Sequence, residues 1–277
     1  MPLVRRCLVV VAALVVTALA APAAAEVVRP DASTAATVVA PPVNGRFDYQ
    51  IGGAYRPQAS VAIVDRDAAD APVAGRYNIC YLNAFQSQPG ASATWSSKGL
   101  LLTKGGRPVG DPDWPGEYLL DTSTAATRDG ILAVVGAWID DCAARGYQAV
   151  EPDNLDSWTR SKGLLTEAHN LAMVTSLATR AHADGLAIAQ KNTSQLGTAG
   201  RDVAHLDFAV AEECQRYAEC GDYTDVYGDR VIEIEYTDNA RRFYTAACAA
   251  RGARISVILR DRDVVPSGRP AYRYQAC

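Results

Sequence analysis

Short apolar runs alternate along the chain with longer segments of helical periodicity. The short runs are rich in Val, Ile, Ala and aromatic residues, a composition typical of buried strands. We expect strands at residues 47–51, 61–64, 77–82, 149–153, 186–191, 207–212, 231–236 and 255–260. A further short run at residues 118–121 has no helix of its own before it, so we interpret it as part of an insertion.

Three longer segments, residues 124–145, 166–184 and 238–251, carry apolar side chains at helical spacing. The second begins with a threonine N-cap, and the third with an aspartate N-cap at Asp238. The apolar face of the first segment comprises Ile131, Val135, Trp138, Ile139 and Cys142.

Each of these helices ends at a glycine, and a strand is expected directly afterwards. Gly146, Gly185 and Gly252 occupy the position at which a left-handed C-cap residue is needed. Repeated units of helix, glycine and strand imply a parallel sheet with helical crossovers. Eight such strands predict an α/β fold, a (β/α)8 TIM barrel in a single domain. A doubly wound open sheet is the alternative.

The N-terminal residues have the pattern of an export signal. Arg5 and Arg6 precede an apolar run at residues 8–19 that is too short to span a bilayer, and an A-x-A cleavage site follows at residues 23–25. We therefore expect three parts: a secretory signal peptide at residues 1–25, a flexible lead-in at residues 26–42 and the barrel domain at residues 43–277. The mature protein would be secreted and extracellular, without a membrane partner.

The charge of the chain argues against nucleic acid as a partner. The formal net charge is −4, and removal of Arg5 and Arg6 with the signal peptide makes it more negative still. An acidic protein of this kind is compatible with a cationic substrate. We expect a monomer.

Six cysteines remain after the signal peptide, and an even number in an exported chain favours disulfides over metal sites or free thiols. They are Cys80, Cys142, Cys214, Cys220, Cys248 and Cys277. The sequence alone does not choose among their possible pairings. We favour a local loop between Cys214 and Cys220 and a bond that ties Cys277 to Cys248, which leaves Cys80 with Cys142.

Acidic residues stand at the carboxyl ends of two expected strands, where barrel enzymes carry their active sites. The first strand ends with Glu151 and Asp153, which share one face, and the second ends at Glu212. Glu213 would point to the opposite side. Carboxylates cost several kcal/mol to desolvate unless they are paired, so they suit the rim of a pocket. Two acidic ends that meet in one cavity would supply the paired carboxylates of glycoside hydrolysis.

Other polar residues at the same strand ends are candidates for substrate binding. They are Gln50, Asp65, Tyr81, Glu151, Asn154, Lys191, Asn192, Glu235 and Tyr236. Lys191 would lower the pKa of neighbouring acids and hold Asp153 ionised. Glu235 and Tyr236 would bind an amino sugar by ion pairing and stacking, and a pair satisfied in the barrel wall fits the sequence about as well.

Other enzyme classes find little support in the sequence. It contains no G-x-S-x-G elbow, no H-E-x-x-H motif, no P-loop and no G-x-G-x-x-G motif. His169, His182 and His205 occupy helical or pre-strand positions away from the acidic strand ends. We expect no metal and no cofactor.

An ordered set of motifs spans the chain from Phe47 to its end. The longest is Gly146-Tyr147-Gln148-Ala149-Val150-Glu151-Pro152-Asp153-Asn154. The others include Asp48-Tyr49-Gln50-Ile51, Trp114-Pro115-Gly116-Glu117-Tyr118, Lys191-Asn192, Ala211-Glu212-Glu213-Cys214 and Leu259-Arg260-Asp261-Arg262-Asp263. Together they resemble the endo-α-1,4-polygalactosaminidases, glycoside hydrolase family 114. Asn83-Ala84-Phe85 departs from the family's serine-alanine-glycine loop, and Ala211 and Glu213 depart from its Asn-Glu-Gln-Cys motif.

The resemblance implies a (β/α)8 barrel that cleaves α-1,4-linked galactosamine polymers with retention of anomeric configuration. Carried over to this sequence, Asp153 would be the nucleophile and Glu212 the general acid/base. The partner would be an amino-sugar polysaccharide. The alternatives are a non-catalytic carbohydrate-binding barrel and a glycosidase on another α-linked substrate.

Overall fold

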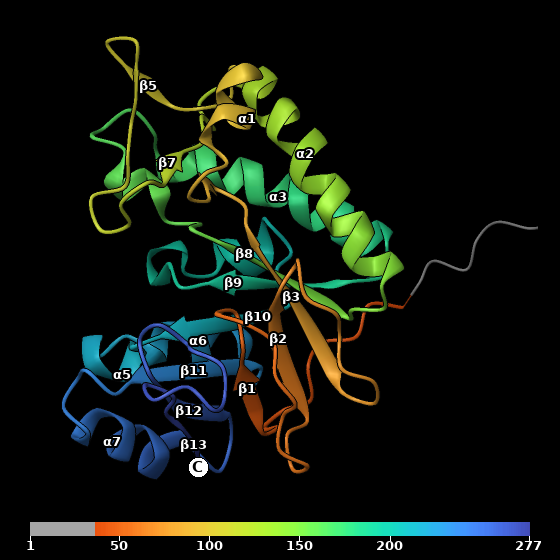
Figure 1. Cartoon of the computed structure of the whole chain (residues 1–277), viewed down its shortest axis with the longest axis vertical. Coiled ribbons are helices and arrows are strands. Elements are labelled where there is room, and N and C mark those ends of the chain that lie inside the picture. Colours follow the sequence, from red (N-terminus) through yellow and green to blue (C-terminus); the bar gives the residue numbers. More distant parts are fainter. Residues whose placement is uncertain (1–36) are drawn as a thin grey trace, which may run out of the picture. The chain divides into compact units, whose positions relative to one another are not determined.

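Nine strands form the main sheet of residues 37–277, which are the residues that the computed structural model describes (Figure 1). Their order is β1 (Phe47–Tyr49), β2 (Ile63–Asp67), β3 (Tyr77–Asn83), β8 (Ala149–Asp153), β9 (Ala187–Lys191), β10 (Phe208–Glu212), β11 (Val231–Tyr236), β12 (Ser256–Arg260) and β13 (Tyr274–Ala276). Neighbours from β1 to β12 are parallel, and β13 is antiparallel to β12. The eight parallel strands are the predicted ones. The predicted signal peptide and most of the lead-in lie outside the described residues.

The sheet curls until its first and last parallel strands meet. β1 and β12 are in contact, and side chains bridge the seam between them. The Tyr274 hydroxyl on β13 donates to the Phe47 carbonyl at 2.8 Å, and the Ser256 hydroxyl donates to the Gly45 carbonyl at 2.6 Å. The sheet is therefore a nearly closed barrel, as predicted.

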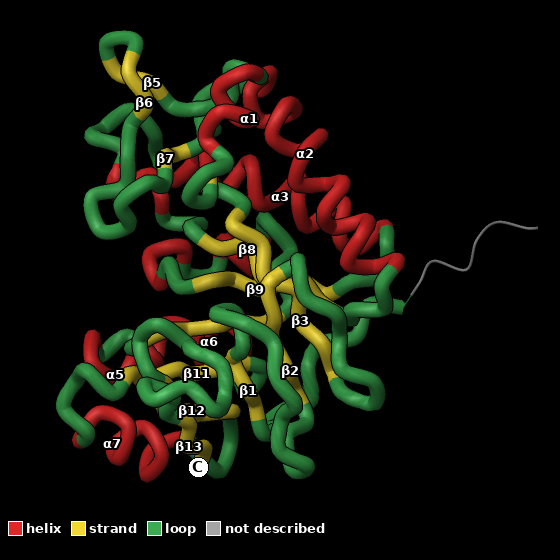
Figure 2. Tube along the Cα trace, viewed as in Figure 1, coloured by secondary structure: helices red, strands yellow, loops and turns green. Residues whose placement is uncertain are grey.

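Helices follow most of the strands and pack on the outside of the sheet (Figures 1 and 2). They are α1 (Ser92–Ser97), α2 (Ala125–Ala144), α3 (Glu167–Ala183), α4 (Ala199–Asp202), α5 (Cys214–Tyr217), α6 (Cys220–Tyr227) and α7 (Arg242–Arg251), with short 3₁₀ turns η1 (Ser157–Arg160) and η2 (Ser194–Leu196). Among these helices, none has both the length and the apolar character needed to cross a membrane.

Of the two predicted N-caps, the one at Thr166 is confirmed, and Thr124 caps α2 without having been predicted to do so. The side chains of Thr124 and Thr166 accept backbone hydrogen bonds and begin α2 and α3. The predicted cap at Asp238 is wrong, because α7 begins after Arg241 and the Asp238 carboxylate pairs with Arg262 at 2.9 Å. Trp138 was expected on the buried face of α2; it is 37% exposed, although it packs edge-on against Trp95.

The insertion between β3 and α2 forms two small antiparallel ladders. One pairs β4 (Gln86–Ser87) with β7 (Tyr118–Leu119), and the other pairs β5 (Thr103–Lys104) with β6 (Arg107–Pro108). The expected short strand near residue 118 is thus part of an insertion.

Strand alternation decides which acids reach the barrel interior. On β11, Ile234 and Tyr236 belong to the interior core with Phe208 and Ile258. Successive strand residues point to opposite faces, so Glu233 and Glu235 point outward toward the helices. The expectation that Glu235 lies in the pocket with Tyr236 is therefore wrong.

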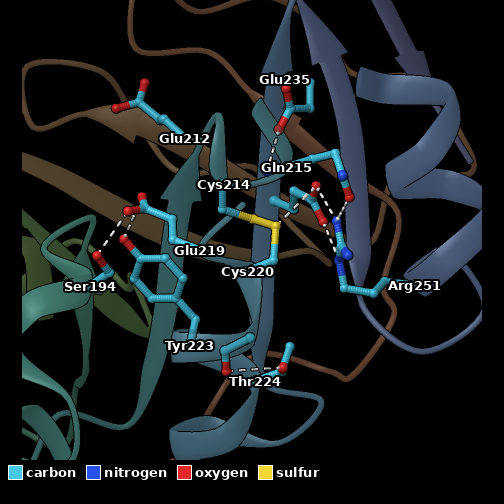
Figure 3. The surroundings of a disulfide bond; sticks show 12 residues. Ser194, Glu212, Cys214, Gln215, Glu219, Cys220, Tyr223, Thr224, Glu235 and Arg251 are labelled. Carbon is cyan, nitrogen blue, oxygen red and sulfur yellow. Dashed lines mark hydrogen bonds and ion pairs between the residues drawn. A yellow bond between two sulfur atoms is a disulfide. The ribbon is translucent and has the colours of Figure 1, made fainter. Parts of the chain in front are cut away.

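The outward acids of β11 form a buried cluster beside a disulfide (Figure 3). Arg251 pairs with Glu233 at 2.9 Å and also donates to Gln215 at 2.7 Å. Glu235 accepts one hydrogen bond from the Gln215 backbone at 3.0 Å, while its buried Oε2 has no partner among the described residues. Burial raises the pKa of Glu235 to about 7.

The three favoured disulfides are confirmed: Cys80–Cys142, Cys214–Cys220 and Cys248–Cys277. Gly146 and Gly185 adopt the left-handed conformation expected of C-caps, with φ of 88° and 77°. Gly252 does not, since its φ is −59°. Position 252 has no room for a larger residue, because a Cβ there would lie 2.8 Å from the Cys248 carbonyl oxygen and 2.9 Å from the Cys277 Cβ.

We predict that Gly252→Ala destabilises the protein by about 1–3 kcal/mol, because the added methyl group overlaps the Cys248–Cys277 bond. Gly221→Ala is the matched control in α6, where a Cβ meets no atom within 4 Å. It should stabilise the helix by about 0.5–1 kcal/mol. Denaturant unfolding measures both, and equal effects of the two substitutions would contradict the close packing at Gly252.

We predict that Glu235→Gln stabilises the protein increasingly as the pH rises. A raised pKa means that the folded protein keeps the proton of Glu235 while the unfolded chain releases it near its ordinary value of 4.5. The stability of the natural protein therefore falls between about pH 4.5 and 7, by about 1–3 kcal/mol, and the variant is spared this loss. Thermal unfolding at acidic and alkaline pH measures the difference. A difference that is the same at both would contradict the prediction.

Candidate active site

A cavity of about 450 Å³ opens at the carboxyl ends of the parallel strands. Seven strands contribute lining side chains: Tyr49 from β1, Asp67 from β2, Tyr81 from β3, Asp153 from β8, Lys191 from β9, Glu212 from β10 and Tyr236 from β11. Loops and the turn η1 add Asp113, Trp114, Glu117, Arg160 and Arg262. The cavity therefore lies where a barrel enzyme carries its site.

Lys191 is the centre of the site. Its side chain is 2% exposed, and its Nζ lies 2.7 Å from Glu151 Oε1, 3.3 Å from Asp153 Oδ1 and 3.5 Å from Glu212 Oε2. Burial disfavours the ammonium form, but the three carboxylates outweigh it and hold the pKa of Lys191 well above its usual value. The lysine is thus a permanent cation beneath two acids that border the cavity.

Asp153 is held in its ionised form. Its Oδ2 accepts a hydrogen bond from the Tyr81 hydroxyl at 2.6 Å, and its Oδ1 accepts one from the Asn154 backbone at 2.7 Å. Burial alone would raise the pKa of Asp153, but Lys191 and these two donors outweigh burial and lower it below its usual value. Asp153 therefore has the charge state that a nucleophilic carboxylate requires.

Glu212 is fixed by two neighbours. Its Oε2 accepts a hydrogen bond from the Asn192 side chain at 2.9 Å, its backbone N–H donates to Asn192 Oδ1 at 2.8 Å, and the Tyr236 hydroxyl donates to Oε1. Its side chain is 24% exposed, against 19% for Asp153. Both acids are therefore anchored from below and open to the cavity.

The two acids lie close to each other. Asp153 Oδ1 and Glu212 Oε2 each lie within 3.5 Å of the same lysine nitrogen, so they are at most about 7 Å apart. Retaining glycosidases separate their carboxyl groups by about 5–5.5 Å, and inverting ones by about 6.5–9.5 Å. The arrangement has the dimensions of a glycosidase site.

The structure brings some of the candidate residues to the cavity and places others elsewhere. Those at the cavity are Asp153, Glu212, Tyr81, Asn154, Lys191, Asn192 and Tyr236. Four do not line it: Gln50, Asp65, Glu151 and Glu235. Glu151 lies two residues before Asp153 on the same strand face, which places it about 6–7 Å deeper in the barrel.

The other misplaced candidates serve the framework. Gln50 is buried, donates to Asp48 at 2.9 Å and accepts from Arg66 at 2.9 Å. Asp65 is buried in the barrel interior. A position near a strand end therefore identified the correct edge of the sheet. It did not determine how deep in the barrel a side chain lies, or whether it points inward or outward.

Several cavity residues escaped the list of candidates. Tyr49 was assigned to an apolar strand, although its hydroxyl contacts Lys191 and Glu151. Arg262 lies 4.0 Å from the centre of the Tyr236 ring and pairs with Glu213 at 2.8 Å. Burial would raise the pKa of Glu213, but Arg262 and Arg216 lower it to about 2. The charged triplet around Arg262 was the available signal.

Comparison with known proteins identifies the family of this chain. The model of glycoside-hydrolase family GH114 matches residues 28–277. Aspergillus fumigatus Ega3, solved in complex with galactosamine, is 24% identical with a TM-score of 0.69, over 90% of this chain and 100% of that one. A variant of the PelA glycoside hydrolase domain from Pseudomonas aeruginosa is 15% identical with a TM-score of 0.55, over 81% of this chain and 96% of that one. The search of curated proteins gives no match. The chain therefore belongs to glycoside-hydrolase family GH114 and is a glycoside hydrolase.

Proposed function

We propose that the enzyme is a secreted, retaining glycosidase that cleaves α-1,4-linked galactosamine-containing polysaccharide. The observation that carries this proposal is the pair of acids held over one buried lysine, at most about 7 Å apart. The galactosamine bound by the structural relative Ega3 supports the choice of sugar. Three disulfides and the expected signal peptide support export.

In the first step, Asp153 attacks the anomeric carbon while Glu212 gives its proton to the departing glycosidic oxygen. The bond from the sugar to that oxygen breaks as the bond to Asp153 forms, which leaves a covalent glycosyl-enzyme. The Tyr81 hydroxyl and the Asn154 N–H aim the carboxylate. Lys191 holds it ionised until the attack.

In the second step, Glu212 takes a proton from water, and the resulting hydroxide attacks the same carbon. The sugar leaves Asp153 with its original configuration, and Glu212 is again protonated. Asn192 and Tyr236 hold Glu212 in place throughout. Each acid thus completes the cycle in its starting state.

The rim of the cavity suits a cationic sugar polymer. Acids at the rim outnumber the arginines: Asp67, Asp113, Glu117, Asp156 and Asp263 against Arg160 and Arg262. Carboxylates favour the ammonium group of galactosamine over a neutral acetamide. Trp114 is 55% exposed at the rim and offers an aromatic face for a sugar ring.

The alternative is a glycosidase that acts on another α-linked sugar. Product analysis on partially deacetylated galactosamine polymer distinguishes the two substrate classes.

We predict that Asp153→Asn and Glu212→Gln each lower kcat by about 10²–10⁴-fold on this polymer. A substrate with a good leaving group should restore the first step of Glu212→Gln, because that step no longer needs an acid, but should not rescue Asp153→Asn. Reducing-end assays and burst kinetics measure these effects. Asp229→Asn is the control, since Asp229 pairs with Arg254 away from the cavity. Full activity of Asp153→Asn would end the assignment.

We predict that Tyr81→Phe shifts the acidic limb of kcat/KM toward higher pH. The variant removes a donor that lowers the pKa of Asp153, so the nucleophile stays protonated to higher pH. Tyr77→Phe is the matched control on the same strand, because its hydroxyl donates to the Val39 carbonyl instead. An unchanged acidic limb in Tyr81→Phe would show that another group controls it.

A further inference from the structure

Glu151 is buried in the barrel interior, where it contacts Lys191. It is 0% exposed, and its Oε1 accepts hydrogen bonds from Lys191 Nζ at 2.7 Å and from the Tyr49 hydroxyl at 2.9 Å. The Tyr49 hydroxyl in turn accepts a hydrogen bond from Lys191 at 2.9 Å. One oxygen of Glu151 therefore faces two donors, of which one is a cation.

Asp65 on β2 lies against the other side of Glu151. It is also 0% exposed, and the two carboxyl groups are within hydrogen-bonding reach of each other. In the part of the chain that the structure describes, neither oxygen of Asp65 has a hydrogen-bond donor, and Glu151 Oε2 has none either. Three buried carboxyl oxygens thus share a space without a protein donor.

Within residues 37–277, Lys191 is the one cation that forms an ion pair with either acid. The interior faces of the surrounding strands carry these titratable groups: Tyr49, Asp67, Tyr77, Tyr81, Glu151, Asp153, Lys191, Glu212, Tyr236 and Arg260. Lys191 already forms ion pairs with three carboxylates, those of Glu151, Asp153 and Glu212. Arg260 donates to the backbone carbonyls of Arg273 and Val265.

A single proton between the two acids satisfies all three oxygens. Two adjacent buried carboxylates do not both ionise, because each disfavours the charge of the other. Glu151 is the better site for the negative charge, since both donors face it. The proton therefore belongs to Asp65, and burial, followed by the charge of Glu151, raises the pKa of Asp65 well above its usual value.

We propose that Asp65 is a positioning residue that is protonated in the active enzyme and donates a hydrogen bond to Glu151 Oε2. With both oxygens held, Glu151 has one orientation, and Lys191 is fixed within reach of Asp153 and Glu212. The role of Asp65 in turnover rests on the proposed function, whereas its protonation does not.

Two substitutions separate the hydrogen bond from the charge. Asp65→Asn keeps the shape and a donor but carries no ionisable group, and Asp65→Leu keeps a similar volume without a donor. We expect Asp65→Asn to retain kcat within about threefold near neutral pH and Asp65→Leu to lose about tenfold or more, because a charged group loses a hydrogen bond. The Tm of Asp65→Asn relative to the natural protein should rise from about pH 4 to about pH 9, since only the natural protein must hold a proton there.

Two outcomes would overturn the proposed role of Asp65. If Asp65→Asn loses as much activity as Asp65→Leu while it stays folded, or if its relative Tm does not change with pH, Asp65 acts as a carboxylate and the proposal fails. If the natural enzyme does not cleave the galactosamine polymer, the proposed function fails, and the Tm comparison still decides the protonation of Asp65.

A spectroscopic measurement on the natural protein covers the case in which Asp65→Asn does not fold. Infrared spectra of protein labelled with ¹³C-aspartate report a protonated aspartate by a shifted carbonyl band. A band that persists at alkaline pH supports the proposal, and its absence overturns it.

Discussion

One buried ammonium group organises this enzyme. Lys191 reaches the barrel interior from β9 and contacts carboxylates on β8 and β10, so it bridges three consecutive strands of the sheet. A buried charge without a partner would cost several kcal/mol, and a buried cluster of acids without a cation would cost more. The lysine and the acids therefore depend on each other, and this pairing lets two largely buried carboxylates stay at the mouth of the barrel.

The depth of each charge is set by the period of the strands. Asp153 and Glu212 end their strands and are partly open to the cavity, whereas Glu151 lies deeper in the barrel and Asp65 is buried beside it. The upper layer performs the proposed chemistry, and the lower layer holds the lysine that keeps it in place. On β11, Glu233 and Glu235 point outward, away from the site, and Glu233 pairs with Arg251.

Much of this could be predicted from local sequence. The apolar runs predicted all eight parallel strands, because each run is buried between the helices and the barrel interior, and the threonine before α3 predicted where that helix starts. The acidic strand ends identified the right edge of the sheet. Local sequence did not determine the direction in which each side chain points or its depth in the barrel. Glu235 follows the polar pattern but points outward, and Glu151 shares the face of Asp153 but is too deep to touch substrate.

The features that escaped prediction depend on distant residues. Gly252 is glycine because Cys277 lies against it, and Tyr49 contacts Lys191, far along the chain. Such contacts arise only when the barrel closes, and they leave no local pattern in the sequence.

The proposed mechanism requires that Asp153, held ionised by Lys191, forms a bond with the sugar. Mass analysis of peptides after reaction with a fluorinated galactosamine donor that slows the second step tests it most directly. The account predicts one sugar attached to Asp153, and a sugar on another residue, or inverted product without any attached sugar, would contradict it.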